Sequence, residues 1–180
     1  MTTPLPRLTF VLGGARSGKS RYAENLVTAT PGPWTYIATS EAWDDEMRAR
    51  IAAHTNRRNE GWTTVEAPLA LVEAINANDR AGNPMLVDCL TLWLTNVILG
   101  GKVIAAEVDR LASVLSAVRG PLVVISNEVG LSIVPDNKLA RQFRDEQGLL
   151  NQRVAALAES VVFVAAGLPL ILKQPTRDTP

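Results

Sequence analysis

Residues 8–20 of the chain, LTFVLGGARSGKS, decide the fold. The segment opens with an apolar run, Leu8–Leu12, and continues into Gly13–Ser20, which satisfies the pattern G-x-x-x-x-G-K-[ST]. Glycines in such a loop let successive backbone N–H groups point inward, and a helix that begins near Gly18 adds its positive N-terminal end. The sequence therefore predicts a strand, a phosphate-binding loop and a helix in succession.

The residue types at the end of this loop indicate nucleotide chemistry. Lys19 is placed to reach the β and γ phosphates, and the hydroxyl of Ser20 is a ligand for Mg²⁺. Asp88 follows the apolar run Met85–Val87, at the carboxyl end of a predicted strand, and would hold the same Mg²⁺ opposite Ser20. The alternatives are a glycine-rich turn that binds nothing and, for Asp88, an N-cap of the predicted helix Cys89–Leu99.

The rest of the chain alternates short apolar runs with longer segments of helical period, a pattern typical of βαβ units. Apolar stripes at three- and four-residue steps predict helices within 104–118 and 139–157. The predicted strands are Leu8–Leu12, Thr35–Ala38, a weaker Thr63–Val65, Met85–Val87, Leu122–Ile125 and Val161–Val164. Most are too uniformly apolar to have one wet face. We expect a P-loop NTPase-like, doubly wound α/β fold with a mostly parallel sheet and helices on both faces.

Length and composition narrow the class of protein. A chain of 180 residues fits one domain, 1–180, with 1–6 and 174–180 as loose tails, and 47% hydrophobic residues exclude disorder. Lys plus Arg equals Asp plus Glu at 18 each, so nucleic acid is not an expected partner. The single cysteine, Cys89, excludes an intramolecular disulfide. Since no apolar stretch is long enough for membrane insertion or a secretory signal, we expect a cytoplasmic protein.

Two motifs bear on which phosphate enzyme this is. A Ras-type switch GTPase needs a guanine-reading N-K-x-D segment, and Asn137–Ala140 lacks the final Asp. Asp145–Gly148 matches the pattern D-x-x-G, but it falls inside a predicted amphipathic helix, which argues against a GTPase switch segment. The sequence therefore favours a small-molecule kinase or a nucleotidyl transferase.

The only histidine, His54, bears on the choice between these two classes. It lies four residues after Arg50, so the two share one face of a predicted helix, and Arg57 and Arg58 follow closely. A neutral imidazole nitrogen attacks phosphorus to form a phosphoramidate, while arginines neutralise the phosphate oxygens. The alternative interpretation is a solvated histidine on a charged helix. The residue types leave both interpretations open.

Several further segments occur in an order that is specific. They are Gly13–Arg21, Tyr36–Ser40, Asp44–Met47 with Arg50, Ile51 and His54, Asp88–Thr91, Ser126–Gly130, Ile133–Asn137, Arg141–Asp145 and Asn151–Arg153. In these segments the chain resembles the bifunctional adenosylcobinamide kinase / adenosylcobinamide-phosphate guanylyltransferase family of cobalamin biosynthesis. The resemblance runs through almost the whole sequence.

The resemblance implies a two-stage activity and a set of site residues. The family phosphorylates adenosylcobinamide with ATP or GTP, then joins GMP from GTP to that phosphate and releases pyrophosphate. Lys19 would act in catalysis, His54 would carry the GMP, Ser20 and Asp88 would hold Mg²⁺, and the chain would form a homo-oligomer. The implied nucleotide contacts are Gly13, Gly14, Ala15, Arg16, Ser17, Gly18, Lys19, Ser20, Ala38, Thr39, Ser40, Thr55, Asn56, Arg57, Arg58, Glu66 and Asp88. For Glu66 the residues alone indicate a solvated loop acid.

Asn127 and Glu128 follow the strand Leu122–Ile125, again at a carboxyl end. Three roles are open for these residues. Glu128 would serve as a base toward the substrate hydroxyl, or Asn127 and Glu128 would hydrogen-bond corrinoid amides, or the two residues would form a turn. Two rival functions also stand beside the two-stage enzyme. One is a plain P-loop kinase in which His54 is structural, and the other is a nucleotide-binding regulatory module without acceptor chemistry.

Overall fold

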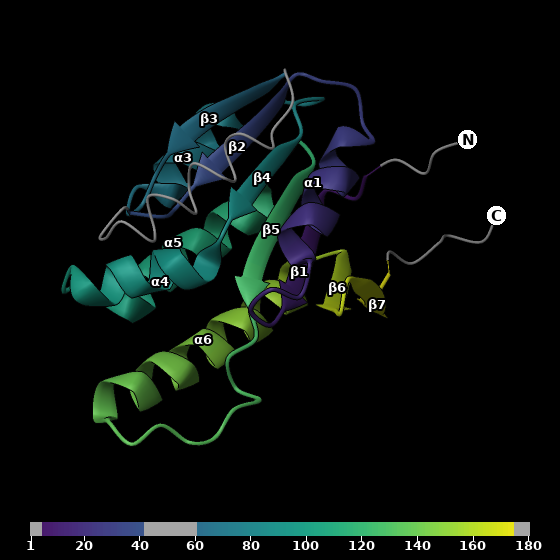
Figure 1. The fold of residues 1–180 in the computed structure, drawn as a ribbon. Helices are drawn as coiled ribbons and strands as arrows, with labels where there is room; N and C mark the ends of the chain where they lie inside the picture. Colours follow the sequence, from purple (N-terminus) through teal and green to yellow (C-terminus); the bar gives the residue numbers. More distant parts are fainter. Residues whose placement is uncertain (1–4, 42–60, 175–180) are drawn as a thin grey trace.

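A computed structural model describes residues 5–41 and 61–174 of the chain (Figure 1). The helices in these ranges are α1 (Lys19–Thr28), α3 (Leu71–Asn78), α4 (Leu90–Leu99), α5 (Ile104–Ala117) and α6 (Lys138–Leu157). The strands are β1 (Leu8–Gly13), β2 (Trp34–Ala38), β3 (Trp62–Glu66), β4 (Met85–Asp88), β5 (Leu122–Asn127), β6 (Ser160–Ala165) and β7 (Leu168–Lys173).

The strands form one seven-stranded sheet in the order β3-β2-β4-β5-β1-β6-β7. All neighbouring pairs are parallel except β6 and β7, which are antiparallel. The predicted α/β fold is confirmed, and each of the six predicted strands is found within two residues of its expected ends.

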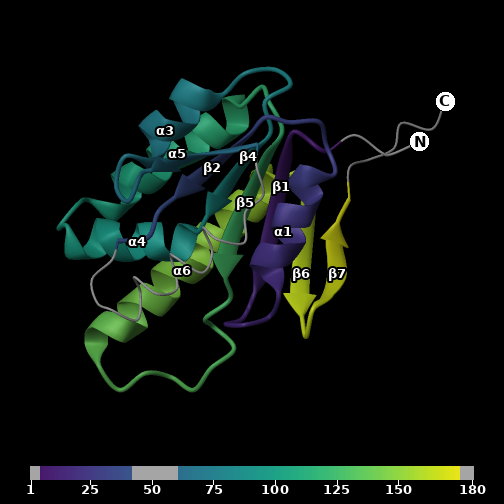
Figure 2. The same cartoon turned by 45° about the horizontal axis from the view of Figure 1, so that its top comes forward.

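The seventh strand, β7, is absent from the sequence-based prediction. It pairs with β6 through a tight turn at Ala166 and Gly167, whose φ angles are 51° and 79°. Positive φ at both central residues matches the turn type that suits the twist of a hairpin. All six residues of β7 are exposed, so the strand lacks the buried pattern by which the other strands are predicted. Figure 2 shows β7 at the edge of the sheet.

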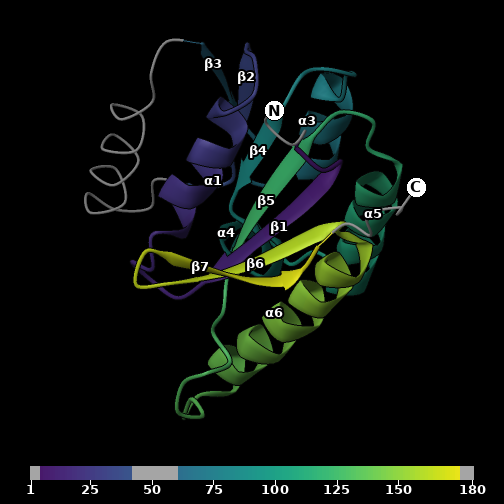
Figure 3. The ribbon, with the colours of Figure 1, turned by 90° about the vertical axis from the view of Figure 1, so that its right-hand side faces the viewer.

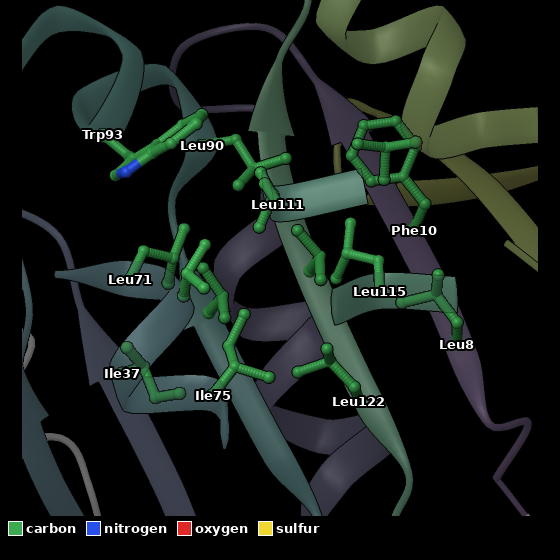
Figure 4. Packing of buried hydrophobic residues seen from close by; sticks show 14 of the residues in the cluster. Leu8, Phe10, Ile37, Leu71, Ile75, Leu90, Trp93, Leu111, Leu115 and Leu122 are labelled. Atoms are coloured by element: carbon green, nitrogen blue, oxygen red, sulfur yellow. The ribbon is translucent and has the colours of Figure 1, made fainter. Parts of the chain in front are cut away.

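Helices cover both faces of the sheet, as the apolar strands require (Figure 3). On one face α1 packs Ala23 and Val27 against Val11 and Val123. On the other face α3, α4, α5 and α6 bury a larger cluster that contains Phe10, and Figure 4 shows its leucines and Trp93 packed together. The two faces of the sheet therefore carry separate apolar layers.

Two further observations concern the ends of the chain and its helices. Leu5, inside the predicted N-terminal tail, packs against the α1-side cluster. None of the helices in residues 5–41 and 61–174 combines the length and apolar composition of a membrane-spanning segment.

Candidate active site

The connections around β1 and β5 define where a ligand can approach the sheet. The two strands are neighbours, with Gly13 beside Asn127 at their carboxyl ends. From β1 the chain crosses one face through α1 to β2, whereas from β5 it crosses the other face through α6 to β6. The two connections diverge, and open α/β sheets bind ligands in the crevice that such a divergence leaves. The Gly13–Ser20 loop lies at this point.

The loop has a conformation that depends on two of its glycines. A Cβ on Gly13 would lie 2.5 Å from both Ser17 Oγ and the backbone oxygen of Val164, so the loop packs directly on β6. Gly18 is the N-cap of α1 with φ 93°, in the left-handed region that favours glycine. The N–H of Gly167 in the β6–β7 turn donates to the carbonyl of Ser17 at 2.8 Å. The unpredicted hairpin is therefore part of the loop's support.

The lysine of the loop is folded over it. Lys19 Nζ donates to the carbonyl of Gly14 at 3.0 Å, and only 9% of the residue is exposed. This places the ammonium group at the loop, beside the N-terminus of α1. Ala15 and Arg16 are exposed, and Ser20 is half-buried in the first turn of α1. A positive charge and a helix N-terminus that converge in this way favour a bound phosphate.

Asp88 is the last residue of β4 and is half-buried. The hydroxyl of Tyr36, itself 4% exposed, donates to Asp88 Oδ2 at 2.9 Å and orients the carboxylate. Asp88 does not cap the following helix, because Cys89 occupies the N-cap position of α4 and no side chain makes a cap hydrogen bond there. The interpretation of Asp88 as an N-cap is therefore wrong. Its carboxylate lies at the carboxyl edge of the sheet, as predicted for the acid of a phosphate site.

Thr39 joins the end of β2 to the segment that follows β4. Its hydroxyl accepts from the N–H of Cys89 at 2.8 Å and donates to the carbonyl of Cys89 at 2.7 Å. Its own N–H donates to the carbonyl of Asp88 at 3.1 Å, and Asn96 Nδ2 donates to the carbonyl of Thr39 at 2.8 Å. Because Thr39 is fully buried, its side chain fixes the backbone next to Asp88.

Cys89 is buried and its thiol stays protonated. Burial, with a smaller effect from the charge of Asp88, raises the pKa of Cys89 to about 11. The thiolate is the nucleophilic form of cysteine, so this side chain acts as a small apolar residue at neutral pH.

The exit of β5 is tied to the phosphate loop. The N–H of Glu128 donates to the carbonyl of Gly13 at 3.2 Å, which continues the register of β5 and β1 by one residue. Glu128 Oε1 accepts from the N–H of Gly130 at 2.6 Å. Asn127 and Glu128 are both half-buried. The carboxylate of Glu128 therefore takes part in the turn, while its backbone N–H is tied to the loop.

Comparison with known proteins decides the family. A family model described as cobinamide kinase / cobinamide phosphate guanyltransferase matches residues 9–172. The chain belongs to this family. One curated relative, the bifunctional adenosylcobalamin biosynthesis protein CobP of Pseudomonas aeruginosa, is 46% identical over 91% of this chain and 95% of its own. A second, CobU of Escherichia coli, is 39% identical over 92% of this chain and 99% of its own.

Two solved structures resemble the fold at low sequence identity. A Pyrococcus horikoshii protein, PH0250, superposes with a TM-score of 0.57 at 9% identity, covering 98% of this chain and 90% of that one. The flagellar accessory protein FlaH of Methanocaldococcus jannaschii gives 0.51 at 11% identity, covering 95% and 80%. These likenesses support the α/β fold.

Family membership bears on the residues that the resemblance implies. Ala38 is in register with Glu66 on one side and with Asp88 on the other, so the three stand in a row across β3, β2 and β4. Glu66 is exposed, and Ala38 and Ser40 are half-buried. His54 and the segment 55–58 lie outside the described residues. The described residues thus include the Gly13–Ser20 loop, Ala38–Ser40, Glu66 and Asp88 among the residues that the resemblance implies.

The structural roles of several residues around the phosphate loop could not be predicted from the sequence alone. Tyr36 and Thr39 lie in Tyr36–Ser40, one of the segments that carry the family resemblance. Nothing in the neighbouring sequence indicates that their side chains hydrogen-bond to Asp88 and Cys89 at the end of β4. The same lack of a local signal holds for the buried polar residues behind β5, which are Thr91, Ser126, Gln147 and Asn151. The hydrogen-bond partners of these side chains lie 21 to 52 residues away along the chain, except that Gln147 and Asn151 are four residues apart on α6. Polar residues next to a predicted strand end are the one available hint.

Proposed function

We propose that this chain phosphorylates adenosylcobinamide with ATP or GTP and then transfers GMP from GTP to the product through a guanylyl-histidine at His54. The second stage gives adenosylcobinamide-GDP and pyrophosphate. The observation that carries the proposal is a formed phosphate loop at the divergence of β1 and β5, in a chain that belongs to the cobinamide kinase / guanyltransferase family.

In the first stage the loop and α1 bind the nucleotide phosphates. Backbone N–H groups and the ammonium of Lys19 meet the β and γ phosphates, where negative charge shifts during transfer. The substrate hydroxyl oxygen forms a bond to the γ phosphorus as the bond to the bridging oxygen breaks. The hydroxyl proton passes to a nearby base, for which Glu128 is the candidate because its backbone is hydrogen-bonded to Gly13 of the loop. In this scheme the chain contributes alignment and charge.

The residues around the loop fit a magnesium ion that enters with the nucleotide. Within residues 5–41 and 61–174 no three His, Cys, Asp or Glu side chains form a metal-binding group. A magnesium–nucleotide complex does not need one, since Mg²⁺ commonly keeps one or two protein ligands besides phosphate oxygens and water. Ser20 and the Tyr36-oriented carboxylate of Asp88 would hold it. Bound there, Mg²⁺ neutralises charge on the phosphates.

In the second stage a neutral nitrogen of His54 attacks the α phosphorus of GTP. A P–N bond forms, the bond to the bridging oxygen breaks and pyrophosphate leaves. A phosphate oxygen of adenosylcobinamide phosphate then attacks the same phosphorus, which breaks the P–N bond and restores the imidazole. Arg50, Arg57 and Arg58 would neutralise the phosphate oxygens. The implied contacts at Ala38–Ser40 and Glu66 would take part in binding the nucleotide.

Two labelled nucleotides test the function as a whole. ATP labelled at the γ phosphate should give labelled adenosylcobinamide phosphate. GTP labelled at the α phosphate should give labelled adenosylcobinamide-GDP when adenosylcobinamide phosphate is the acceptor. Transfer of the γ label alone supports the plain kinase, and transfer of neither supports the regulatory module. Either of those results contradicts the two-stage proposal.

Assembly and location follow from the same proposal. Chains should associate through the exposed apolar edge strand β7, where Leu168, Leu170 and Leu172 are 72%, 60% and 56% exposed. Light scattering should give the mass of a homo-oligomer, and Leu170→Lys should lower it. Because its nucleotide substrates are in the cytoplasm, we expect the protein there, and cell fractionation tests this.

A further inference from the structure

Four polar side chains from three elements are buried behind the exit of β5. Each is at most 8% exposed, and they are Thr91 of α4, Ser126 of β5, and Gln147 and Asn151 of α6. Gln147 Nε2 donates to Ser126 Oγ and to Asn151 Oδ1, both at 2.9 Å. Ser126 Oγ donates to Asn151 Oδ1 at 2.8 Å, and it lies 3.4 Å from Thr91 Oγ1. We call these four side chains the β5 network.

The directions of these hydrogen bonds are mutually consistent. The Ser126 hydroxyl proton is committed to Asn151, so Ser126 Oγ accepts from Gln147 and the hydroxyl proton of Thr91 points toward Ser126. Thr91 Oγ1 can then act as an acceptor, and it receives the N–H of Asn127 at 2.8 Å. Each hydroxyl therefore donates once and accepts from another group, which fixes its rotation.

The β5 network holds the backbone of one residue from both sides. Thr91 receives the N–H of Asn127, and Asn151 Nδ2 donates to the carbonyl of Asn127 at 3.0 Å. The next residue, Glu128, donates its N–H to Gly13 at the start of the phosphate loop. A continuous chain of hydrogen bonds thus runs from α4 and α6 through the exit of β5 to the loop.

This arrangement is not what apolar packing alone would select. The neighbouring residues of α6, Leu150 and Val154, belong to the large apolar cluster, and so do Leu90 and Leu94 of α4. Buried polar networks add little net stability compared with apolar residues, but the hydrogen bonds that they make fix one arrangement of the groups they hold. In the β5 network Gln147 Oε1 has no hydrogen-bond partner among the described residues, whereas the side-chain atoms that hold Asn127 are paired with it. Here the group that is held is the backbone carrying Asn127 and Glu128.

We propose that the β5 network consists of positioning residues for phosphoryl transfer, which keep Asn127 and Glu128 aligned with the phosphate loop so that an acceptor hydroxyl is held in line with the γ phosphorus. The inference rests on the kinase stage of the proposed function. Nucleotide binding uses the loop and α1, which the network does not touch directly. Its loss should therefore affect turnover with acceptor more than binding of nucleotide.

Thr91→Val is the most direct test, because it keeps the shape of the side chain and removes the hydroxyl. We expect kcat for phosphorylation of adenosylcobinamide to fall about 10- to 100-fold, as a misplacement of about 1 Å produces. The dissociation constant of ATP, measured by calorimetry, should change less than about threefold, which separates positioning from uniform binding. Thr91→Ser restores the hydroxyl and should restore kcat. Hydrogen exchange should be faster in residues 124–128 of Thr91→Val.

Thr95→Val is the matched control. Thr95 is one turn further along α4, and its hydroxyl donates to the carbonyl of Thr91 at 2.9 Å without reaching β5. This variant should keep wild-type kcat and wild-type exchange in residues 124–128. If Thr95→Val loses as much kcat as Thr91→Val, the effect belongs to α4 in general and the positioning role is refuted.

Two other results overturn the proposal. One is a folded Thr91→Val with faster exchange but normal kcat, which makes the network purely structural. The other is an equal loss in ATP affinity and kcat, which makes it part of the nucleotide site. If Thr91→Val does not fold, Asn151→Ala, which frees the carbonyl of Asn127, should give the same pattern. Absence of turnover in the wild type refutes the kinase stage itself, so the two failures are distinguishable.

Discussion

Replacement of Gly13 by alanine should distort the phosphate loop, although it adds only a methyl group and removes no functional group. The added methyl would lie 2.5 Å from Ser17 Oγ and 2.5 Å from the backbone oxygen of Val164. The serine can rotate away, but the carbonyl belongs to β6, which is held in the sheet by β1 and β7. The strain must therefore separate the start of the loop from β6.

The neighbouring glycine provides a matched comparison. A Cβ on Gly14 meets nothing within 4 Å, and Gly14 does not have a positive φ. Overpacking a close contact costs about 1 to 3 kcal/mol in the free energy of unfolding. For a domain of this size each kcal/mol corresponds to about 2 to 4 °C in Tm. We expect Gly13→Ala to lose about 2 to 12 °C and Gly14→Ala to stay within about 0.5 kcal/mol of the wild type.

Urea denaturation and thermal melting of the three proteins, without nucleotide, measure this difference. The ATP affinity of Gly13→Ala should fall with its stability, since the methyl distorts the backbone that presents the N–H groups. If Gly13→Ala and Gly14→Ala are equally stable, the close approach of the loop to β6 is not real.

Three further changes have defined outcomes. Lys19→Ala should lower kcat/KM of both stages by about 100-fold or more, because a charge aimed at the transferring phosphates is lost. The circular dichroism spectrum of the variant should match that of the wild type. Normal turnover of the variant would show that the loop has no part in the mechanism. Asp88→Asn keeps an oxygen that can accept from Tyr36 but loses the charge, so the Mg²⁺ concentration for half-maximal activity should rise, and an unchanged Mg²⁺ titration would contradict the metal role. Burial raises the pKa of Cys89 from 9.0 to about 11, so the folded state keeps a proton that the unfolded state loses in this window, and the free energy of unfolding should fall as pH rises through it. In Cys89→Ala that component of the pH dependence should vanish, and an identical slope in both proteins would show that the thiol is not buried.

The sequence is sufficient to predict the fold where local signals and burial agree. Five of the six predicted strands, all but Thr63–Val65, are mainly apolar runs, and parallel strands covered on both faces need that composition. The edge strand β7 escapes prediction because Gly167 and Pro169 interrupt an apolar stretch and because no residue of β7 is buried. The two-residue turn at Ala166 and Gly167, between two apolar runs, is the signal that indicates a hairpin.

The phosphate loop could be predicted because its chemistry is contiguous in sequence. Asp88 could be placed at a strand end, but the contact with Tyr36 depends on the adjacency of β2 and β4, which a single sequence does not specify. Apart from Gln147 and Asn151, which are four residues apart on α6, the β5 network joins residues 21 to 36 positions apart through the packing of α4 and α6. Such contacts arise only when the helices dock, so no local pattern predicts them.

Incubation of the purified protein with Mg²⁺ and GTP labelled at the α phosphate, without corrinoid, is the sharpest test of the guanylyl-histidine. We predict covalent label on the wild type that is lost in acid and stable in alkali, as expected for a P–N bond. His54→Ala should carry no label while it still phosphorylates adenosylcobinamide, since that stage uses the loop, Mg²⁺ and a base. Label that survives in His54→Ala, or label that is lost in alkali, would contradict the guanylyl-histidine.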